Sequence, residues 1–487
     1  MTIAAQAVAD RAPFMDMLRQ YQAAGTVPFS CPGHKRGRGA TEQVRELLGD
    51  ALFDCDVWFN TGDHDRLLRS AEALAARVWA ADRSFFLVNG SSSGNHAYLL
   101  AALRPGDEVI VARDLHKSLL VGLILTGARP VYVTPRLHPE LGIGLGLEAD
   151  DVAAALDRHP AAKLVALVSP SYYGVATDLS GVVEAAHSRA VPVYVDEAWG
   201  PHLGFHPALP DPAMVARADG AVTSTHKILS SLSQSSILNV RTGLIDPARV
   251  AQTVRMMQTT SPLLPLLSSL DACRQQMAER GEELVERALE LAGRARARLL
   301  MLPGLDVLGP DRLGLDPRRY DPLKLVIDVA RLGMTGLQAE TALRERFAIA
   351  PEGSDLVRVV CVVTLGDTPQ CIDQLIGAFT ALCAEHNARP APPAPRRAAR
   401  ALSEPTQALT PRDAFFSPTR SVPLQHAAGK VAAELVLPYP PGIPVLAPGE
   451  VIDADAVDYL LACRAAGSHI CGPADPRLGS IRIVDRD

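Results

Sequence analysis

The sequence predicts an α/β protein built around a mostly parallel sheet. Between about Ser84 and Val240, short runs rich in β-branched residues alternate with helical stretches, and this rhythm is typical of strand–helix–strand units. The runs are almost continuously apolar, which indicates strands covered by helices on both faces. A chain of 487 residues also exceeds what one core usually holds, about 250–300 residues, so two or three domains are expected.

The expected elements follow one another along the chain. A helix within residues 64–84 carries an apolar stripe that is spaced as one helical face. Its members are Leu67, Ala71, Leu74 and Val78. Six strands are then expected in SFFLVNG, DEVIVAR, RPVYVTP, AKLVALVSP, VPVYVDEA and ADGAVTST. A long helix over residues 269–302 leads to a second unit with two strands of its own, LKLVIDVAR and LVRVVCVVTLG.

These elements divide the chain into five segments. Residues 1–83 form an N-terminal segment with the first helix, 84–304 the large sheet domain, 305–387 a small α/β domain, 388–410 a linker and 411–487 a C-terminal domain. The linker is predicted because ARPAPPAPRRAARALSEPTQALTP is rich in proline, alanine and arginine and has no apolar period.

Composition excludes several classes of function. The 48 basic residues against 54 acids give a net charge of −6, so no basic surface for nucleic acid is expected. Charges interrupt every apolar run before the roughly 20 residues that a membrane span needs. The first residues lack a basic leader followed by an apolar stretch. We therefore expect a soluble, cytoplasmic protein. Its eight cysteines contain no C-x-x-C pair, which indicates neither a metal site nor a disulfide framework.

A lysine surrounded by hydroxyl-bearing residues follows one of the predicted strands. Lys227 stands in TSTHKILSSLSQSSI, beside Ser224 and His226. An isolated lysine is more often a surface residue. However, Asp196 ends the strand VPVYVDEA, 31 residues upstream, and ligands of open α/β sheets bind at the carboxyl ends of strands. Both side chains are therefore expected in one crevice.

Two further features lie at the same edge of the predicted sheet. In VNGSSSGN a strand runs through glycine into Ser91, Ser92 and Ser93 and then into a helix. Free amides at a helix start bind anions, although serine and glycine also serve as ordinary helix caps. His116 follows the strand DEVIVAR, and a lone histidine can equally be structural.

Together these features describe a cofactor with a phosphate, a basic ring nitrogen, a flat ring and an aldehyde, which are the parts of pyridoxal 5'-phosphate. Lys227 would form the Schiff base, and Asp196 would keep the ring nitrogen protonated so that the ring accepts electrons. His116 would stack on the ring. The phosphate donors would be Ser91, Ser92, Ser93, Ser224 and His226.

Six segments carry a family resemblance. They are STHKILSSLSQSSIL, VDEAWGPHLGFHPALP, FSCPGHKRGRG, SPSYYGVATDL, TTSPLLPLLSSLDACR and LVLPYPPGIPVLAPGE, and they extend from about Phe29 to Glu450. The chain resembles the bacterial ornithine/lysine/arginine decarboxylases, which are pyridoxal phosphate enzymes of the aspartate-aminotransferase type. The resemblance implies a large cofactor domain, a small α/β domain and a C-terminal domain. It also implies a homodimer, or a higher homo-oligomer, whose active sites lie between subunits.

The resemblance also implies roles for single residues around the cofactor. Lys227 would hold the cofactor and Asp196 would pair with its ring nitrogen. Ala198 and His116 would cover opposite faces of the ring. Trp199 occupies a position where the large decarboxylases also carry tryptophan.

Substrate contacts follow from the same resemblance. Thr260 and Ser261, in TTSP, would reach the phosphate or the substrate of the neighbouring subunit. Glu450, in APGE, is the first candidate to bind the distal cation of the substrate, with Glu434 and Glu352 as alternatives. For each acid, the competing interpretation is a solvated or ion-paired surface carboxylate.

Two segments depart from the family pattern. PFSCPGHK has Ser30 where the family has histidine, and WFNTGDHDRLLR, residues 58–69, replaces a longer motif. In the family, these segments line the route to the cofactor and substrate. The two departures therefore affect the choice of substrate more than the core chemistry. The chain also lacks the long N-terminal wing domain of the acid-induced enzymes and resembles the short, biosynthetic form.

The predicted reaction is decarboxylation of a basic amino acid, and the residues do not distinguish lysine, ornithine and arginine. The same scaffold also supports transamination and other pyridoxal chemistry. Arg358, in LVRVVCVV, could hold a substrate carboxylate as an aminotransferase requires. A third alternative is a non-catalytic homologue. The presence of Lys227, Asp196 and the serines disfavours it.

Overall fold

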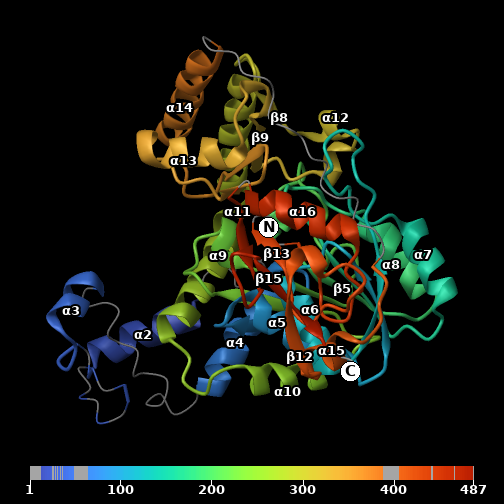
Figure 1. The fold of residues 1–487 in the computed structure, drawn as a ribbon. Coiled ribbons are helices and arrows are strands. Elements are labelled where there is room, and N and C mark those ends of the chain that lie inside the picture. Colours follow the sequence, from blue (N-terminus) through green and yellow to red (C-terminus); the bar gives the residue numbers. More distant parts are fainter. Residues whose placement is uncertain are drawn as a thin grey trace.

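The computed structural model describes residues 12–24, 27, 29, 31–32, 34–35, 37–48, 64–387, 405–439, 443–465 and 467–485. A large sheet domain lies at the centre of the molecule, the small domain with α13 and α14 stands at one end of it, and the C-terminal segment lies beside both (Figure 1). Within the described part of the chain, no helix is long and apolar enough to span a membrane.

A seven-stranded sheet forms the core of the large domain. Its strand order is β1-β7-β6-β5-β4-β2-β3, in which β2 to β6 pair in parallel and β1 and β7 run antiparallel to their neighbours. The strands are β1 (Arg83–Leu87), β2 (Glu108–Ala112), β3 (Arg129–Val133), β4 (Leu164–Val168), β5 (Val193–Asp196), β6 (Gly220–Thr223) and β7 (Ser236–Val240). The mostly parallel sheet is thus confirmed.

Strand β7 is the one strand of this sheet that the sequence analysis did not predict. It returns antiparallel to β6 after a short connection that contains Lys227. The connection between the two strands, residues 224–235, places Lys227 shortly after the end of β6. The lysine therefore lies on the link between two paired strands.

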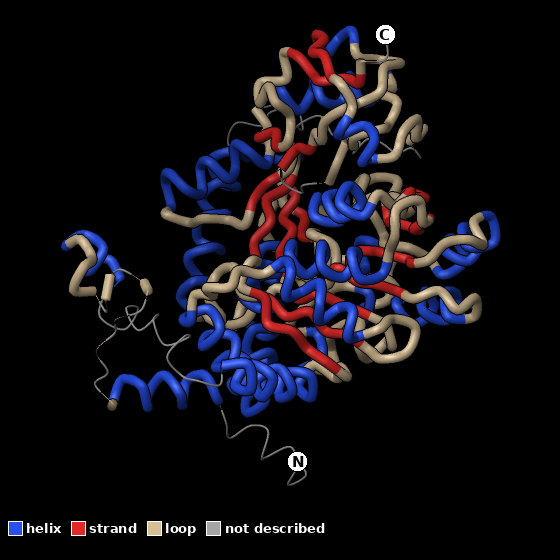
Figure 2. The backbone as a smooth tube through the Cα atoms, turned by 90° about the horizontal axis from the view of Figure 1, so that it is seen from below, coloured by secondary structure: helices blue, strands red, loops and turns tan. Residues whose placement is uncertain are grey.

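Helices cover both faces of the sheet, as the continuous apolar strands predict (Figure 2). On one face, β-strand side chains pack with α5 (Gly90–Ala102), α6 (Lys117–Thr126) and α10 (Pro247–Met257). On the other face, they pack with α7 (Ala149–Arg158) and α8 (Leu179–His187). The strands are buried on both sides, which explains their nearly unbroken apolar sequence.

The long helix α11 (Leu264–Leu300) connects the large and small domains. Its buried side chains share one core with α4 (His64–Val78) and with the sheet of the small domain. Of the stripe predicted on α4, Ala71 is fully buried, and Leu67 and Val78 are partly buried and pack against this core. Leu74 is partly buried and is not among the residues of this core. The predicted helix of residues 269–302 is therefore present and begins five residues earlier.

The small domain is an antiparallel sheet with helices on it. The strand order is β10-β11-β9-β8. Its elements are β8 (Asp306–Val307), α12 (Pro310–Leu313), β9 (Lys324–Asp328), α13 (Gly336–Phe347), β10 (Gly353–Ser354), β11 (Arg358–Val362) and α14 (Pro369–Asn387). Helix α13 begins with a capping box, in which Thr335 and Gln338 each satisfy the backbone N–H of the other.

The C-terminal segment packs against the large domain. It contains α15 (Pro411–Phe416), β12 (Thr419–Pro423), β13 (Leu437–Tyr439), α16 (Ala454–Ala465), β14 (His469–Cys471) and β15 (Ser480–Val484). Arg412 of α15 donates a hydrogen bond to the carbonyl of Leu125 in α6, at 2.8 Å. The remaining helices are α2 (Pro13–Ala23), α3 (Glu42–Leu48) and α9 (Thr225–Ile228). Most of the predicted linker, residues 388–404, lies outside the described residues, and the five-segment division stays a proposal.

Candidate active site

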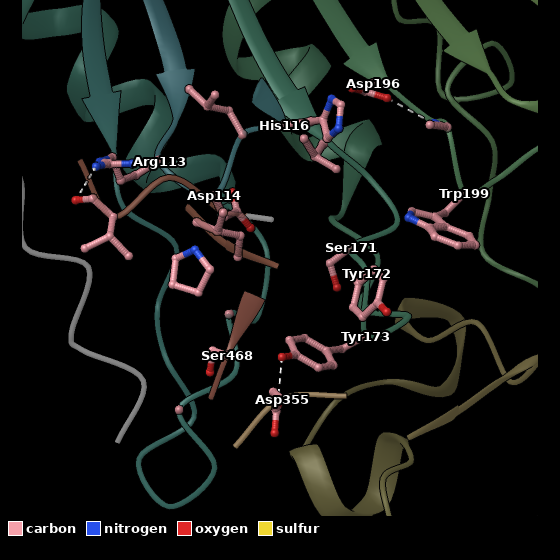
Figure 3. Close-up of a pocket in the computed structure, with 18 of the residues that line it drawn as sticks. Arg113, Asp114, His116, Ser171, Tyr172, Tyr173, Asp196, Trp199, Asp355 and Ser468 are labelled. Atoms are coloured by element: carbon pink, nitrogen blue, oxygen red, sulfur yellow. Dashed lines mark hydrogen bonds between the residues drawn. The ribbon is translucent and has the colours of Figure 1, made fainter. Parts of the chain in front are cut away.

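A cavity of about 510 Å³ opens at the carboxyl ends of the parallel strands. Its wall combines the large domain, the small domain through Asp355 and Arg358, and the C-terminal segment through Glu450 and Ser468. Figure 3 shows Asp355 and Ser468 in this wall. Ten residues expected from the sequence line it together. They are Ser91, Ser92, His116, Asp196, Ala198, Trp199, Ser224, His226, Lys227 and Glu450.

Asp196 is the last residue of β5 and is almost fully buried. One carboxylate oxygen accepts a hydrogen bond from Asn95 Nδ2 at 2.7 Å, and the other accepts one from the Ala198 N–H at 3.2 Å. The Asn95 carbonyl oxygen in turn accepts from the Tyr194 hydroxyl at 2.7 Å. Asp196 is thus held in one orientation at the floor of the cavity.

Sequence reasoning missed Asn95, although a signal was present. Ser91 and Asn95 are four residues apart at the start of α5, so both lie on one face of that helix. Asn95 also donates to Ser118 at 2.7 Å. It therefore connects two elements of the cavity wall, β5 and α6.

His116 caps the N-terminus of α6. Its Nδ1 accepts from the Ser118 N–H at 3.3 Å and lies 2.7 Å from the Ser118 hydroxyl. Burial lowers the pKa of His116 below its ordinary value, and this effect outweighs the nearby Asp196 carboxylate, which acts in the opposite direction. The ring is therefore neutral at neutral pH and offers a flat, uncharged face.

Lys227 lies in α9, directly after β6. Its Nζ is 3.9 Å from the centroid of the Trp199 ring. Burial lowers the pKa of Lys227, and the carboxylates of Asp196 and Glu352 partly oppose this effect. A lysine with a lowered pKa has more of the neutral amine that reacts with an aldehyde.

A second lysine, Lys324, lies on the same tryptophan and was not predicted. Its Nζ is 3.0 Å from the Trp199 ring centroid, and the residue is fully buried at the start of β9. No described residue forms a hydrogen bond with this Nζ. Burial holds the pKa of Lys324 well below its ordinary value. A charged residue opening the apolar strand LKLVIDVAR was the available signal.

The start of α5 supplies an anion-binding corner. Asn89, Gly90, Ser91 and Ser92 line the cavity there. The first amide of the helix, on Gly90, donates to the Gln234 carbonyl at 2.7 Å, and no side chain caps the helix. The Ser91 and Ser224 hydroxyls lie 2.7 Å apart. His226 also reaches the cavity, with its Nδ1 2.7 Å from the Ser235 carbonyl oxygen.

Ser93 is not brought to this corner. Its hydroxyl donates to the Gly90 carbonyl at 2.8 Å within the same helix, and the residue does not line the cavity. Its spacing explains the difference, because consecutive residues of a helix point in different directions. Ser93 therefore supports the first turn of α5 in this structure.

The three candidate substrate acids occupy different environments. Glu450 is buried and pairs with Arg113 at 3.1 Å. Glu434 lies outside the cavity, where its two oxygens accept from the N–H groups of Ala474 and Arg482, both at 2.7 Å. Glu352 also lies outside the lining, although its carboxylate interacts electrostatically with Lys324 and Lys227.

Two of the expected residues lie away from the cavity. Thr260 and Ser261 are exposed between α10 and α11 and do not line it. Ser30 lies outside the described residues, as do residues 58–63 of the replaced segment.

Arg358 is in the cavity wall but is already neutralised. Its guanidinium pairs with Asp355 at 3.0 Å and lies 3.9 Å from Asp328. Asp355 also accepts a hydrogen bond from the Tyr173 hydroxyl at 2.8 Å. A guanidinium held by two carboxylates is a weak site for a substrate carboxylate.

The cavity fits the chemistry of pyridoxal phosphate at each of its parts. The uncapped start of α5 with Ser91 and Ser224 matches a phosphate. A buried, fixed carboxylate at Asp196 matches a protonated ring nitrogen, the neutral His116 ring matches a flat aromatic face, and the Lys227 amine matches an aldehyde.

Comparison with solved structures defines the class of protein. The lysine decarboxylase of Francisella novicida superposes with a TM-score of 0.83 at 21% identity, covering 98% of this chain and 82% of its own. Ureidoglycine–glyoxylate aminotransferase of Bacillus subtilis superposes with a TM-score of 0.54 at 15% identity, over 71% and 90% of the two chains. The chain therefore has the aspartate-aminotransferase type of fold, with its cavity at the strand ends.

Comparison of sequences gives the family. The family model described as "Orn/Lys/Arg decarboxylase, major domain" matches residues 12–370, and the model of the C-terminal domain matches residues 395–476. An arginine decarboxylase of Halalkalibacterium halodurans is 40% identical over 465 residues, 94% of each chain. One of Bacillus subtilis is 39% identical over 480 residues, 97% of each. The chain belongs to the ornithine/lysine/arginine decarboxylase family and is a decarboxylase.

Proposed function

We propose that this protein uses pyridoxal phosphate to decarboxylate arginine, releasing agmatine and carbon dioxide. The observation that carries the proposal is the convergence of Lys227, Asp196 and His116 on one cavity at the strand ends. The choice of arginine rests on the relatives, since those about 40% identical over nearly the whole chain are named arginine decarboxylases.

The residues of the cavity would divide the work. The cofactor, when bound to Lys227, supplies an electron sink for the electron pair left when carbon dioxide departs. Asp196 would hold a proton on the ring nitrogen, and Asn95 fixes the Asp196 carboxylate for that purpose. Neutral His116 would cover one ring face and Ala198 the other. The Ser91, Ser92, Ser224 and His226 side chains would bind the phosphate.

The side chain of Lys227 would donate the proton that completes the reaction. The lowered pKa of Lys227 makes its ammonium form a better proton donor than an exposed lysine. It would protonate the carbon from which the carboxylate has left. The apolar Trp199 ring beside Lys227 would help to exclude water from this carbon.

The alternative of transamination is less well supported. An aminotransferase requires a cation for the substrate carboxylate, and Arg358 is already held by Asp355 and Asp328. Decarboxylation requires no such anchor, because the carboxylate must leave.

We also propose a homodimer or higher homo-oligomer. Thr260 and Ser261 are exposed in the single chain. Side chains that serve the active site of a neighbouring subunit must be accessible in this way. The chain would bind a small basic amino acid. Neither its net charge nor any helix in the part of the chain that the structure describes favours nucleic acid or a membrane as partner.

Product analysis tests this proposal. Purified protein with added pyridoxal phosphate should be incubated separately with arginine, ornithine and lysine, and the products identified by mass. We expect agmatine and carbon dioxide from arginine, at least ten times faster than diamine from the other two. Lys227→Ala should abolish product formation. Formation of the 2-oxo acid from arginine instead of agmatine would show transamination, and diamine as the main product would reassign the substrate.

A further inference from the structure

Among the described residues, six carboxylates line the cavity, and five of them are engaged by other groups. Glu140 pairs with Arg312 at 3.1 Å and Glu450 pairs with Arg113 at 3.1 Å. Asp355 is held by Arg358 and Tyr173, Asp196 by Asn95, and Asp453 accepts from the N–H of Ala456 at 2.7 Å. The sixth is Asp114.

Asp114 differs from the others in its hydrogen bonds. It lies between β2 and α6, two residues before His116. Among the described residues, the N–H of Asp114 itself is the hydrogen-bond donor found for its carboxylate. Arg113, the adjacent cation, turns away to Glu450 and to the carbonyl of Pro444, which its Nη1 contacts at 2.8 Å. Arg113 therefore acts on Asp114 only through the electrostatic attraction of its charge, and none of the described cations forms an ion pair with Asp114.

Asp114 lines the open cavity beside Gly144. A Cβ at Gly144 would stand 3.6 Å from Asp114 Oδ2, so the glycine leaves the carboxylate without a side chain against it from this segment. Figure 3 shows Asp114 between Arg113 and His116, across the open centre of the pocket from Ser171 and Tyr172. Burial raises the pKa of Asp114 to about 6, and a cation bound beside the carboxylate would offset this cost of desolvation.

We infer that Asp114 is the residue that binds the distal cation of the substrate. The inference rests on the proposed function, because it assigns the specificity of the same cavity. It also moves this role away from Glu450, whose carboxylate is occupied by Arg113 and by the N–H of Ala447 at 2.9 Å. Asp114 lies near His116, which would cover the cofactor ring, so a substrate held at the ring could extend its cationic end towards it.

Binding of a product-like probe tests the inference separately from catalysis. Agmatine carries the distal guanidinium but no carboxylate to lose, and butylamine has the same four-carbon amine without the guanidinium. Both would be titrated by calorimetry into the holoenzyme of the wild type and of Asp114→Asn. We expect Asp114→Asn to weaken agmatine binding about ten- to a hundred-fold, the range for a charged hydrogen bond, and to leave butylamine binding unchanged.

A matched control and a second variant complete the test. Glu140→Gln removes a charge from the same cavity wall at a carboxylate already paired with Arg312, and agmatine binding should stay within two-fold of wild type. Asp114→Glu keeps the charge and extends it by one methylene, so it should favour 3-aminopropylguanidine, the analogue one methylene shorter, over agmatine.

The outcomes separate the inference from the proposed function. Equal weakening of agmatine and butylamine by Asp114→Asn, unchanged agmatine binding, or an unchanged length preference in Asp114→Glu would overturn the role of Asp114. If the wild type binds agmatine through Asp114 but forms no product from any basic amino acid, the proposed reaction fails and the assignment of Asp114 stands. If the wild type does not bind agmatine, the inference fails.

Discussion

Asn95 joins three parts of the cavity into one hydrogen-bonded network. Its side chain bonds to Asp196, Ser118 and Tyr194, each at 2.7 Å. Ser118 in turn contacts His116. One amide thus orients both the carboxylate proposed for the ring nitrogen and the imidazole proposed for the ring face.

Replacing this amide should reduce the reaction without unfolding the chain. Asn95→Ala removes a hydrogen bond to a charged group, worth about 1.5–3 kcal/mol, so we expect kcat to fall about ten- to a hundred-fold. The rate of carbon dioxide release from arginine measures this effect. Ser93→Ala on the same helix is the control, because the Ser93 hydroxyl bonds within its own turn. A wild-type rate in Asn95→Ala would show that Asp196 is held by other contacts.

At the scale of elements, the end of β5 places two acids side by side in different environments. Asp196 reaches the cavity, whereas the next residue, Glu197, is buried and accepts a hydrogen bond from the Ala213 N–H at 2.7 Å. Burial raises the pKa of Glu197 to about 8. The folded protein therefore holds a proton on Glu197 at pH values where an unfolded chain has released it.

This shift predicts a pH-dependent stability. Because the pKa of Glu197 is raised on folding, its contribution is present below about pH 4.5 and is lost as the pH rises to about 8. Glu197→Gln keeps the hydrogen-bond acceptor and cannot ionise. The difference in melting temperature between Glu197→Gln and wild type should therefore shift in favour of the variant as the pH rises from 5 to 9. The corresponding change in the free energy of unfolding is about a few kcal/mol. Thermal unfolding across this range measures the difference.

An exposed glutamate provides the comparison for this measurement. Glu290 lies on the exposed side of α11, so Glu290→Gln makes the same charge change without burial. It should shift the melting temperature equally at all pH values. A parallel pH profile for Glu197→Gln and wild type would contradict the raised pKa.

At the scale of the whole molecule, a buried ion pair ties the C-terminal segment to the large domain. Arg113 follows β2, and Glu450 lies more than 300 residues later. Both side chains are almost completely buried, at 4% and 2% exposure. Removing one partner of such a pair leaves the other charge buried and uncompensated.

Glu450→Ala should therefore destabilise the fold by about 3–5 kcal/mol. Thermal unfolding would detect the loss, and hydrogen exchange should show it first in the C-terminal segment and in the residues after β2. Glu450→Gln retains an acceptor for Arg113 and should lose less. A wild-type melting temperature in Glu450→Ala would mean that Arg113 finds another partner.

The sequence by itself determined the class of fold and the reactive centre. Continuous apolar strands alternating with helices favour a helix-covered, mostly parallel sheet, and a strand end places its last residue at the ligand edge. Local rules of this kind predicted the positions of Lys227, Asp196 and His116. They also placed α11, the strands β1 to β6 of the large sheet, and β9 and β11 of the small domain.

Contacts between distant segments were decided by the tertiary structure alone. Glu450 pairs with Arg113, Lys324 lies on Trp199, and Asn95 reaches Asp196, and no local pattern encodes such pairs. The choice among acids illustrates the reason. Whether a carboxylate is free to bind a cation depends on which other charges the fold brings to it and how much water remains, and these are properties of packing rather than of spacing along the chain.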